Sequence, residues 1–113
     1  MILRGYKVTN YNKRSAISFG SSVVDYSQRR SAYPSYGCGP LTVFTTLAEA
    51  VRFQSQVTGR IFTCFYIKSD RGEVWNTNYS MSLEELLVRN SDCLTPGTVC
   101  LADEVILGQE VLL

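Results

Sequence analysis

One segment in the middle of the chain constrains the fold most, because it predicts a strand, a helix and a second strand in immediate succession. The run Leu41–Phe44 is β-branched and aromatic, which favours a short buried strand. Thr45 or Thr46 then caps a helix, and Thr46 forms the capping-box pattern with Glu49. Apolar residues follow at helical spacing. Gly59 suits the left-handed position at which many helices end. The aromatic, largely apolar run Arg60–Lys68 predicts a central strand that is covered on both faces.

Shorter signals on either side of this segment predict further strands and a second helix. The expected strands are Leu3–Val8, Ala16–Phe19, Ser22–Tyr26, Glu73–Thr77, Thr98–Leu101 and Glu104–Leu107, with Gln109–Leu113 as an extension of the last. Glu73–Thr77 follows a turn at Ser69–Gly72, and we expect it to form a hairpin with the strand before it. Ser82 and Glu85 repeat the capping box and predict a helix that ends at Asn90–Cys93.

Two segments are expected to be irregular. Ser27–Pro40 contains two prolines and two glycines, which disfavours regular structure. We therefore expect one long loop at about residues 27–40, and loops of that length are usually functional or mobile. Asp103 and Glu104 predict a bulge or a turn between two strands.

These elements predict one domain of the α+β class over residues 1–113. The expected architecture is a twisted, mostly antiparallel sheet of five or six strands, with two short helices and the long loop. The hydrophobic content of 45% is enough for a core. No apolar run approaches the roughly 18 residues that cross a bilayer, and Met1–Gly5 lacks the apolar stretch of a secretory signal. We therefore expect a cytoplasmic protein without a membrane partner.

The cysteines and the absence of histidine exclude several kinds of site. Cys38, Cys64, Cys93 and Cys100 include no closely spaced pair of the kind that structural zinc sites use. Without histidine the chain has no Ser-His-Asp or Cys-His arrangement for nucleophilic catalysis. It also has no side chain that ordinarily titrates near neutral pH. We expect no metal and no cofactor, and an enzyme of this composition would depend on carboxylates, tyrosines, arginines or backbone donors.

Basic residues and tyrosines are concentrated in the first third of the chain. Residues 1–40 contain six basic residues against one acid, a net charge of +5, whereas residues 41–113 contain five against nine acids, a net charge of −4. Five of the seven tyrosines lie within residues 1–36. Arginine binds phosphate bidentately and tyrosine stacks on nucleobases, so the combination is typical of a nucleotide site. Nearby glycines would add backbone N–H donors. The candidate ligand-binding residues are Arg4, Tyr6, Lys7, Arg29, Arg30, Tyr33, Tyr36, Gly37, Gly39 and Trp75.

The same residues allow other interpretations. Tyrosine and arginine are also typical of protein–protein hot spots, and a proline-containing loop can simply cover a sheet. The basic and acidic parts of the chain can also neutralise each other. Trp75 is either a wall of the site beside Tyr33 and Tyr36 or a core aromatic. The nucleotide interpretation requires that the cationic and phenolic side chains near the amino end converge into one concave, electropositive surface.

The order of the elements resembles two known groups of proteins. The chain resembles small uncharacterised proteins of bacteriophages and prophages in the runs Arg4–Val8, Gly39–Phe44, Leu47–Phe53 and Arg60–Cys64. The order of a strand, a Ser/Thr-bearing strand and a helix is also similar to the ADP-ribosyltransferase fold. That family has Arg or His on its first strand, Ser-x-Ser/Thr or Tyr on the next, and a catalytic glutamate later. The resemblance would assign these roles to Arg4, to Thr45 and Thr46, and to Glu104 or Glu73, and it would imply NAD as the substrate.

The sequence therefore predicts a small non-enzymatic binding protein, phage-encoded as the first resemblance implies. It would occupy a host protein or sequester a nucleotide-like anion in the host cytoplasm. One alternative is an enzyme of the ADP-ribosyltransferase type that uses NAD. A second alternative is a structural protein that forms a homo-oligomer through the apolar C-terminal strand Val111–Leu113, because an exposed apolar strand is a natural pairing edge.

Overall fold

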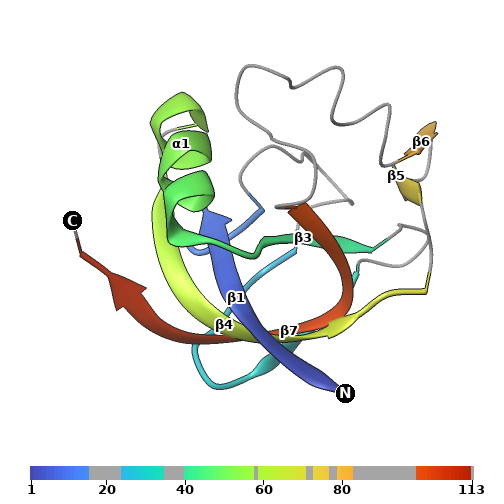
Figure 1. The fold of residues 1–113 in the computed structure, drawn as a ribbon, viewed down its shortest axis with the longest axis horizontal. Coiled ribbons are helices and arrows are strands. Elements are labelled where there is room, and N and C mark those ends of the chain that lie inside the picture. Colours follow the sequence, from blue (N-terminus) through green and yellow to red (C-terminus); the bar gives the residue numbers. More distant parts are fainter. Residues whose placement is uncertain are drawn as a thin grey trace.

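The structure is a computed structural model that describes residues 1–15, 24–34, 40–57, 59–70, 73–76, 79–82 and 99–112. Its elements are β1 (Ile2–Thr9), β2 (Ser31–Ala32), β3 (Leu41–Phe44), α1 (Leu47–Val57), β4 (Arg60–Lys68), β5 (Glu73–Asn76), β6 (Tyr79–Ser82) and β7 (Val99–Val111). Figure 1 shows α1 on one side of strongly curved strands, with the hairpin of β5 and β6 well away from the helix.

Four of the five strands of the main sheet close into a ring, and β2 lies outside it beside β7. The strand order of the sheet is β2-β7-β3-β1-β4, all neighbours are antiparallel, and β7 also pairs with β4. The first residues of β7, Val99–Ala102, pair with β3, and the following ones, Ala102–Val111, pair with β4. In Figure 1, β7 follows one long arc from β3 toward the C-terminus. Because this bent strand serves two neighbours, β1, β4, β7 and β3 form a small antiparallel barrel.

The predicted succession of strand, helix and strand is confirmed by β3, α1 and β4. The Thr46 hydroxyl oxygen accepts a hydrogen bond from the Glu49 N–H at 3.3 Å, which caps the helix as expected. The reason predicted for a glycine at position 59 is wrong, because the backbone of Gly59 is not in the left-handed region. Glycine is needed there because a Cβ would overlap the carbonyl oxygen of Thr9.

The expected α+β class and the mostly antiparallel sheet are confirmed, with five strands in the main sheet. The described residues contain one helix, and the second expected helix falls on residues 83–90, outside the described ranges. The expected strand Ala16–Phe19 also lies outside them. β5 pairs with β6 and not with β4 as predicted. The physical reason is that β1 and β7 already occupy both sides of β4.

Two predictions about irregular segments need correction. The expected long loop contains the short strand β2, which pairs with β7. The two expected C-terminal strands are one strand, β7. Ile67 of β4 faces Glu104, whereas the next residue, Lys68, faces Ala102, so Asp103 is the extra residue of a β-bulge. A bulge lets a strand bend without ending, and β7 therefore continues past the predicted break.

Apolar side chains pack on both faces of the curved sheet. Those that fill the barrel interior most completely are Val43, Phe62, Val105 and Leu107, each at most 1% exposed. On the outer face, α1 packs Ala50 and Phe53 against the strands, and the Phe44 and Phe53 ring centres are 5.2 Å apart. The helix covers only part of this face, because Phe65 and Ile67 remain 45% and 38% exposed. This corrects the prediction that β4 is covered on both faces throughout.

Candidate functional site

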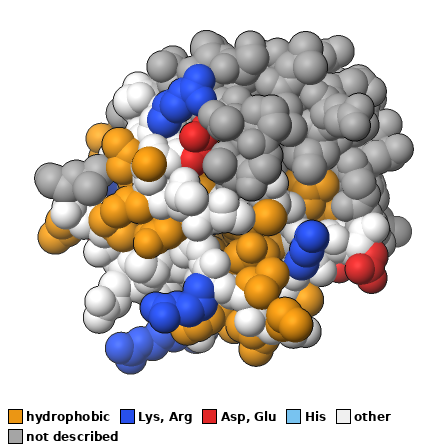
Figure 2. All heavy atoms as spheres, in the orientation of Figure 1, with side chains coloured by type: hydrophobic (Ala, Val, Ile, Leu, Met, Phe, Trp, Pro, Cys, Tyr) orange, Lys and Arg blue, Asp and Glu red, His pale blue; other side chains and the backbone are white. Residues whose placement is uncertain are grey.

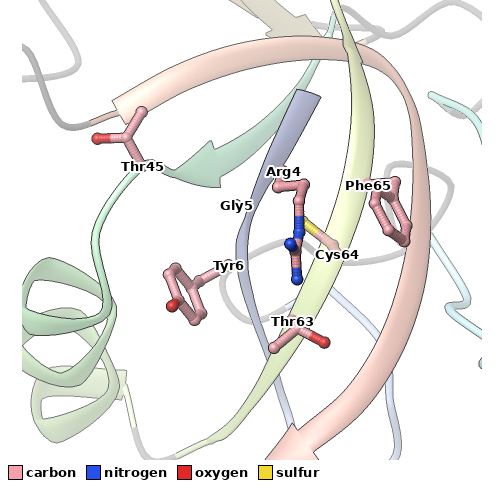
Figure 3. A pocket seen from close by; sticks show the side chains of 7 residues that line it. All are labelled: Arg4, Gly5, Tyr6, Thr45, Thr63, Cys64 and Phe65. Atoms are coloured by element: carbon pink, nitrogen blue, oxygen red, sulfur yellow. The ribbon is translucent and has the colours of Figure 1, made fainter. Parts of the chain in front are cut away.

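A pocket opens on the outer face of β1 and β4, next to the start of α1. Its volume is about 320 Å3, and its lining consists of Arg4, Gly5, Tyr6, Thr45, Thr63, Cys64 and Phe65. The pairing of β1 with β4 sets Arg4 opposite Phe65 and Tyr6 opposite Thr63, and opposite residues of an antiparallel pair share one face. Thr45 follows β3 in the turn before α1. Figure 3 shows the Arg4 guanidinium between the rings of Tyr6 and Phe65.

Arg4 supplies the positive charge of this pocket. Its side chain is exposed, and its guanidinium carbon lies 5.7 Å from the centre of the Phe65 ring, which is a cation–π distance. The ion pairs between described residues are Arg14–Asp25, Arg52–Glu49 and Arg60–Glu110. Since Arg4 is in none of them, no carboxylate of the described residues neutralises its charge. Within the described part of the chain, no ion pair therefore competes with an anionic ligand for the guanidinium.

Gly5 and Cys64 are the buried members of the lining. A Cβ at Gly5 would lie 2.7 Å from the Phe44 carbonyl oxygen and 3.0 Å from the Tyr66 ring, so glycine is required where β1 passes close to β3. Burial raises the pKa of the Cys64 thiol to about 11. The thiol consequently stays protonated at neutral pH and is a poor nucleophile.

The structure brings together Arg4 and Tyr6, two of the residues predicted to bind a ligand, and separates Lys7 from them. Side chains alternate along a strand, so Lys7 points to the opposite face of β1 and is only 6% exposed. Its Nζ donates a hydrogen bond to the Thr42 carbonyl oxygen at 2.6 Å and lies 5.1 Å from the centre of the Tyr26 ring. Burial lowers the pKa of Lys7 to about 8. Lys7 therefore belongs to the barrel interior and not to the wall of the pocket.

The other candidates lie elsewhere. Arg29, Arg30 and Tyr33 flank β2 and are exposed, and they are not part of the pocket lining. The Arg29 N–H donates a hydrogen bond to the Leu107 carbonyl oxygen, with Arg29 at a left-handed φ of 66°. Figure 2 shows Lys and Arg side chains at separate places on the face it presents, with hydrophobic side chains between them. The described candidates therefore occupy three places, and the single electropositive surface that the nucleotide interpretation required is not formed by them. What remains of that prediction is a smaller site with one cation, Arg4, and one tyrosine, Tyr6. Outside the described residues lie Tyr36, Gly37, Gly39 and the side chain of Trp75.

Sequence reasoning did not select Thr63 and Phe65 as site residues. Strand alternation in β4 places these two side chains on one face. It does not show which distant strand lies beside that face, because this depends on the register between β1 and β4. Thr45 was selected only through the resemblance to ADP-ribosyltransferases, and the structure places it in the same pocket as Arg4.

The described residues contain no group of three or more His, Cys, Asp or Glu side chains that could hold a metal ion. In the same part of the chain, no helix has the length and apolar character needed to span a membrane.

Comparisons of the chain with protein-family models, with curated proteins and with solved structures found no match. The fold and the site therefore define the class of protein directly. It is a small α+β protein whose antiparallel sheet closes on itself and carries an arginine-containing pocket on the outer face.

Proposed function

We propose that the protein binds a small nucleotide-like anion in this pocket and does not transform it. The observation that carries the proposal is Arg4, an exposed guanidinium between two aromatic rings and without a carboxylate partner among the described residues. A guanidinium binds phosphate oxygens bidentately, and aromatic faces stack on nucleobases. Thr45 lines the same pocket. The Thr63 hydroxyl donates to the Gln109 carbonyl oxygen at 3.3 Å and accepts from the Gln109 N–H at 3.0 Å, so only its remaining lone pair can accept a hydrogen bond from a sugar hydroxyl.

The size of the pocket favours a small ligand. Small-molecule sites usually occupy about 300–1,000 Å3, and this pocket lies near the lower end at about 320 Å3. We infer a mononucleotide, or one half of a dinucleotide. Binding without reaction is favoured because the described lining contains no carboxylate and its thiol, Cys64, is protonated at neutral pH.

Calorimetric titration with ADP tests this proposal. The wild-type protein is expected to bind ADP, and Arg4→Ala should bind it roughly 10- to 100-fold more weakly, because a hydrogen bond to a charged group contributes about 1.5–3 kcal/mol. Lys68→Ala is the matched control, since Lys68 is an exposed cation at the end of β4 and is not part of the pocket lining. Lys68→Ala changes the net charge by the same amount as Arg4→Ala. It should alter ADP affinity by less than about twofold, because exposed charges are screened by salt.

Separate titrations with adenosine and with pyrophosphate distinguish binding of the nucleoside part of ADP from binding of its phosphates. Arg4→Ala should weaken pyrophosphate binding and leave adenosine binding largely unchanged, because only pyrophosphate depends on the guanidinium. The proposal fails if wild-type protein does not bind ADP at millimolar concentration. It also fails if Arg4→Ala and Lys68→Ala lose affinity equally, because that result would indicate unspecific charge attraction.

A second candidate function is transfer of ADP-ribose from NAD. The observation that favours it is that Arg4 and Thr45, two positions singled out by the resemblance to ADP-ribosyltransferases, line the same pocket. The matching glutamate is less well supported. Glu104 accepts a hydrogen bond from the Ser31 hydroxyl at 2.6 Å and is not part of the pocket lining. The side chain of Glu73 lies outside the described residues.

Release of nicotinamide from NAD, measured by chromatography in the presence of cell lysate, distinguishes the two functions. The enzyme hypothesis predicts release that is lost in Glu104→Gln or in Glu73→Gln. The binding hypothesis predicts no release above that of lysate alone, although NAD should still compete with ADP for the pocket.

A further inference from the structure

Of the neighbouring strands in the ring, β1 and β3 have the fewest paired residues. β1 pairs with β4 along its whole length, whereas within these two fully described strands β1 pairs with β3 only at Tyr6 and Phe44. Main-chain pairing between these two strands is therefore confined to this one residue pair. On one side, Arg4 and Thr45 border the outer pocket. On the other side, β1 and β3 are joined by the side chain of Lys7.

Lys7 makes this connection from inside the barrel. Its Nζ donates to the Thr42 carbonyl oxygen at 2.6 Å, and Thr42 lies in β3 two residues before Phe44. The ammonium also lies 5.1 Å from the centre of the Tyr26 ring. A charged donor forms a stronger hydrogen bond than a neutral one, and the dry interior strengthens such interactions further. The side chain thus replaces main-chain pairing that the two strands lack at this point.

We propose that Lys7 is a positioning residue of the pocket, whose charged amine holds β3 against β1 so that Arg4, Tyr6 and Thr45 keep the spacing that an anion requires. This inference rests on the proposed function, because it names what controls the same site. Lys7 does not touch the ligand. It acts through β1, in which it adjoins Tyr6, and through β3, which leads directly into Thr45.

The groups around Lys7 determine when it is charged. Tyr26, which precedes β2, and Cys64 of β4 face it, and both stay neutral near neutral pH because burial raises the pKa of each. β3 presents the Thr42 carbonyl oxygen, and β7 adds apolar side chains and Cys100 to the same cluster. No carboxylate of the described residues is paired with Lys7. Burial therefore dominates, and it lowers the pKa of Lys7 to about 8.

Deprotonation of Lys7 should weaken the connection, since a neutral amine donates a weaker hydrogen bond and makes no cation–π contact. We expect the affinity for ADP to fall roughly 5- to 20-fold between about pH 7.5 and about pH 9.5, as is typical of coupling between two sites. The phosphates of ADP are already ionised over this range, because the last phosphate pKa is about 6. Bound ADP should in turn raise the pKa of Lys7, because linkage is reciprocal.

The experiment compares ADP binding by the wild-type protein, Lys7→Met and Lys68→Met across this pH range. Methionine keeps the length and apolar stem of lysine, so the interior stays filled, and circular dichroism checks that each variant is folded. Lys7→Met should bind ADP roughly 5- to 20-fold more weakly at about pH 7.5, with little further change on raising the pH. Lys68→Met should follow the wild-type profile. Lys7→Met keeps every other ionisable group, so a difference between the two profiles belongs to Lys7.

The outcomes separate this inference from the proposed function. If folded Lys7→Met binds ADP with wild-type affinity and pH profile, while Arg4→Ala does not bind it, the inference is wrong and the proposed function stands. If wild-type protein does not bind ADP, the proposed function fails and the inference fails with it. If Lys7→Met does not fold, the wild-type profile decides, because an affinity that is constant from about pH 7.5 to about pH 9.5 contradicts a charged Lys7 at this position.

Discussion

At the scale of single residues, Lys7 lowers the free energy of unfolding although its side chain joins two strands. An ammonium group that is taken out of water loses its hydration. The Thr42 carbonyl and the Tyr26 ring replace that hydration incompletely, as the lowered pKa of Lys7 indicates. A side chain that opposes the stability of its surroundings is commonly found at a functional site. This cost in stability is consistent with a positioning role for Lys7, although its side chain lies in the barrel interior and not in the wall of the pocket.

The stability of the protein should therefore rise with pH just above neutrality. In the unfolded chain, Lys7 keeps its proton up to the ordinary pKa of 10.5, whereas in the folded protein it loses the proton near pH 8. Between these values the unfolded state holds more protons, so raising the pH favours the folded state. We expect the free energy of unfolding, measured with urea, to increase by about 1 kcal/mol from about pH 7 to about pH 9.

Lys7→Met is the control for this measurement. It should be more stable than the wild-type protein at about pH 7, by about 1–3 kcal/mol, because no charge is buried. Its stability should not rise toward about pH 9. A wild-type protein and a Lys7→Met variant with parallel pH profiles would contradict the assignment of the lowered pKa to Lys7.

The sequence predicted Arg4 and Tyr6 as site residues, and the structure brings both to the pocket. It also predicted Lys7, which lies on the opposite face of the same strand. Arg4 and Lys7 are three positions apart, and side chains alternate with a period of two, so the two cations cannot share one face of a strand. Which face lies inside a barrel depends on the other strands, and the alternation within β1 does not reveal it.

At the scale of elements, two adjacent threonines between β3 and α1 have different roles. Thr45 lines the pocket. Thr46 caps the helix through the hydrogen bond from the Glu49 N–H to its hydroxyl oxygen. Since the two side chains have the same chemistry, their substitutions by alanine form a matched pair that tests on which of the two positions ligand binding depends.

We expect Thr46→Ala to lower the free energy of unfolding by about 1 kcal/mol, the usual cost of removing a helix N-cap, with little effect on ADP affinity. Thr45→Ala should weaken ADP binding more than Thr46→Ala does, because Thr45 lines the pocket. Urea denaturation and calorimetric titration of the two variants measure both quantities. A loss of ADP affinity in Thr46→Ala that exceeds the loss in Thr45→Ala would place the ligand elsewhere.

Elements that depend on local patterns were predicted well, and those that depend on distant pairing were not. Capping, helical spacing and apolar runs identified β3, α1 and β4 with nearly their observed bounds. The partner of β5 was wrong, because the place beside β4 is taken by β7 from the far end of the chain. The continuity of β7 was also missed, because turn-forming residues predict a break where a bulge at Asp103 lets the strand bend and continue.

At the scale of the whole molecule, β7 determines the shape by pairing with both β3 and β4. The α+β class and the antiparallel sheet follow from element order, but the closure of the sheet does not, because it depends on a long-range register. The C-terminal strand that the oligomer hypothesis treats as a free edge pairs with β4 as far as Val111, and Leu112 beyond it is 84% exposed. The strand therefore already has a partner on one side within this chain.

The strands of the ring differ in how many of their residues are paired, and this predicts that they differ in protection from amide hydrogen exchange. Amide hydrogens in β4 and in the part of β7 that pairs with it should exchange most slowly, because these long strands are paired over most of their length. Amides of β3 should exchange faster than those of β4, and Lys7→Met should increase this difference, because it removes the connection between β1 and β3 while it raises the stability of the whole fold. Hydrogen exchange followed by NMR measures this order. Equal protection of β3 and β4 in both proteins would show that the β1–β3 junction is not the weak point of the ring.

The most direct test of the account is a crystal structure of the protein with ADP. The account predicts phosphate oxygens on the Arg4 guanidinium and the adenine ring against Tyr6 or Phe65. Density for ADP beside Arg29 and Arg30, or an empty pocket in crystals saturated with ADP, would contradict it.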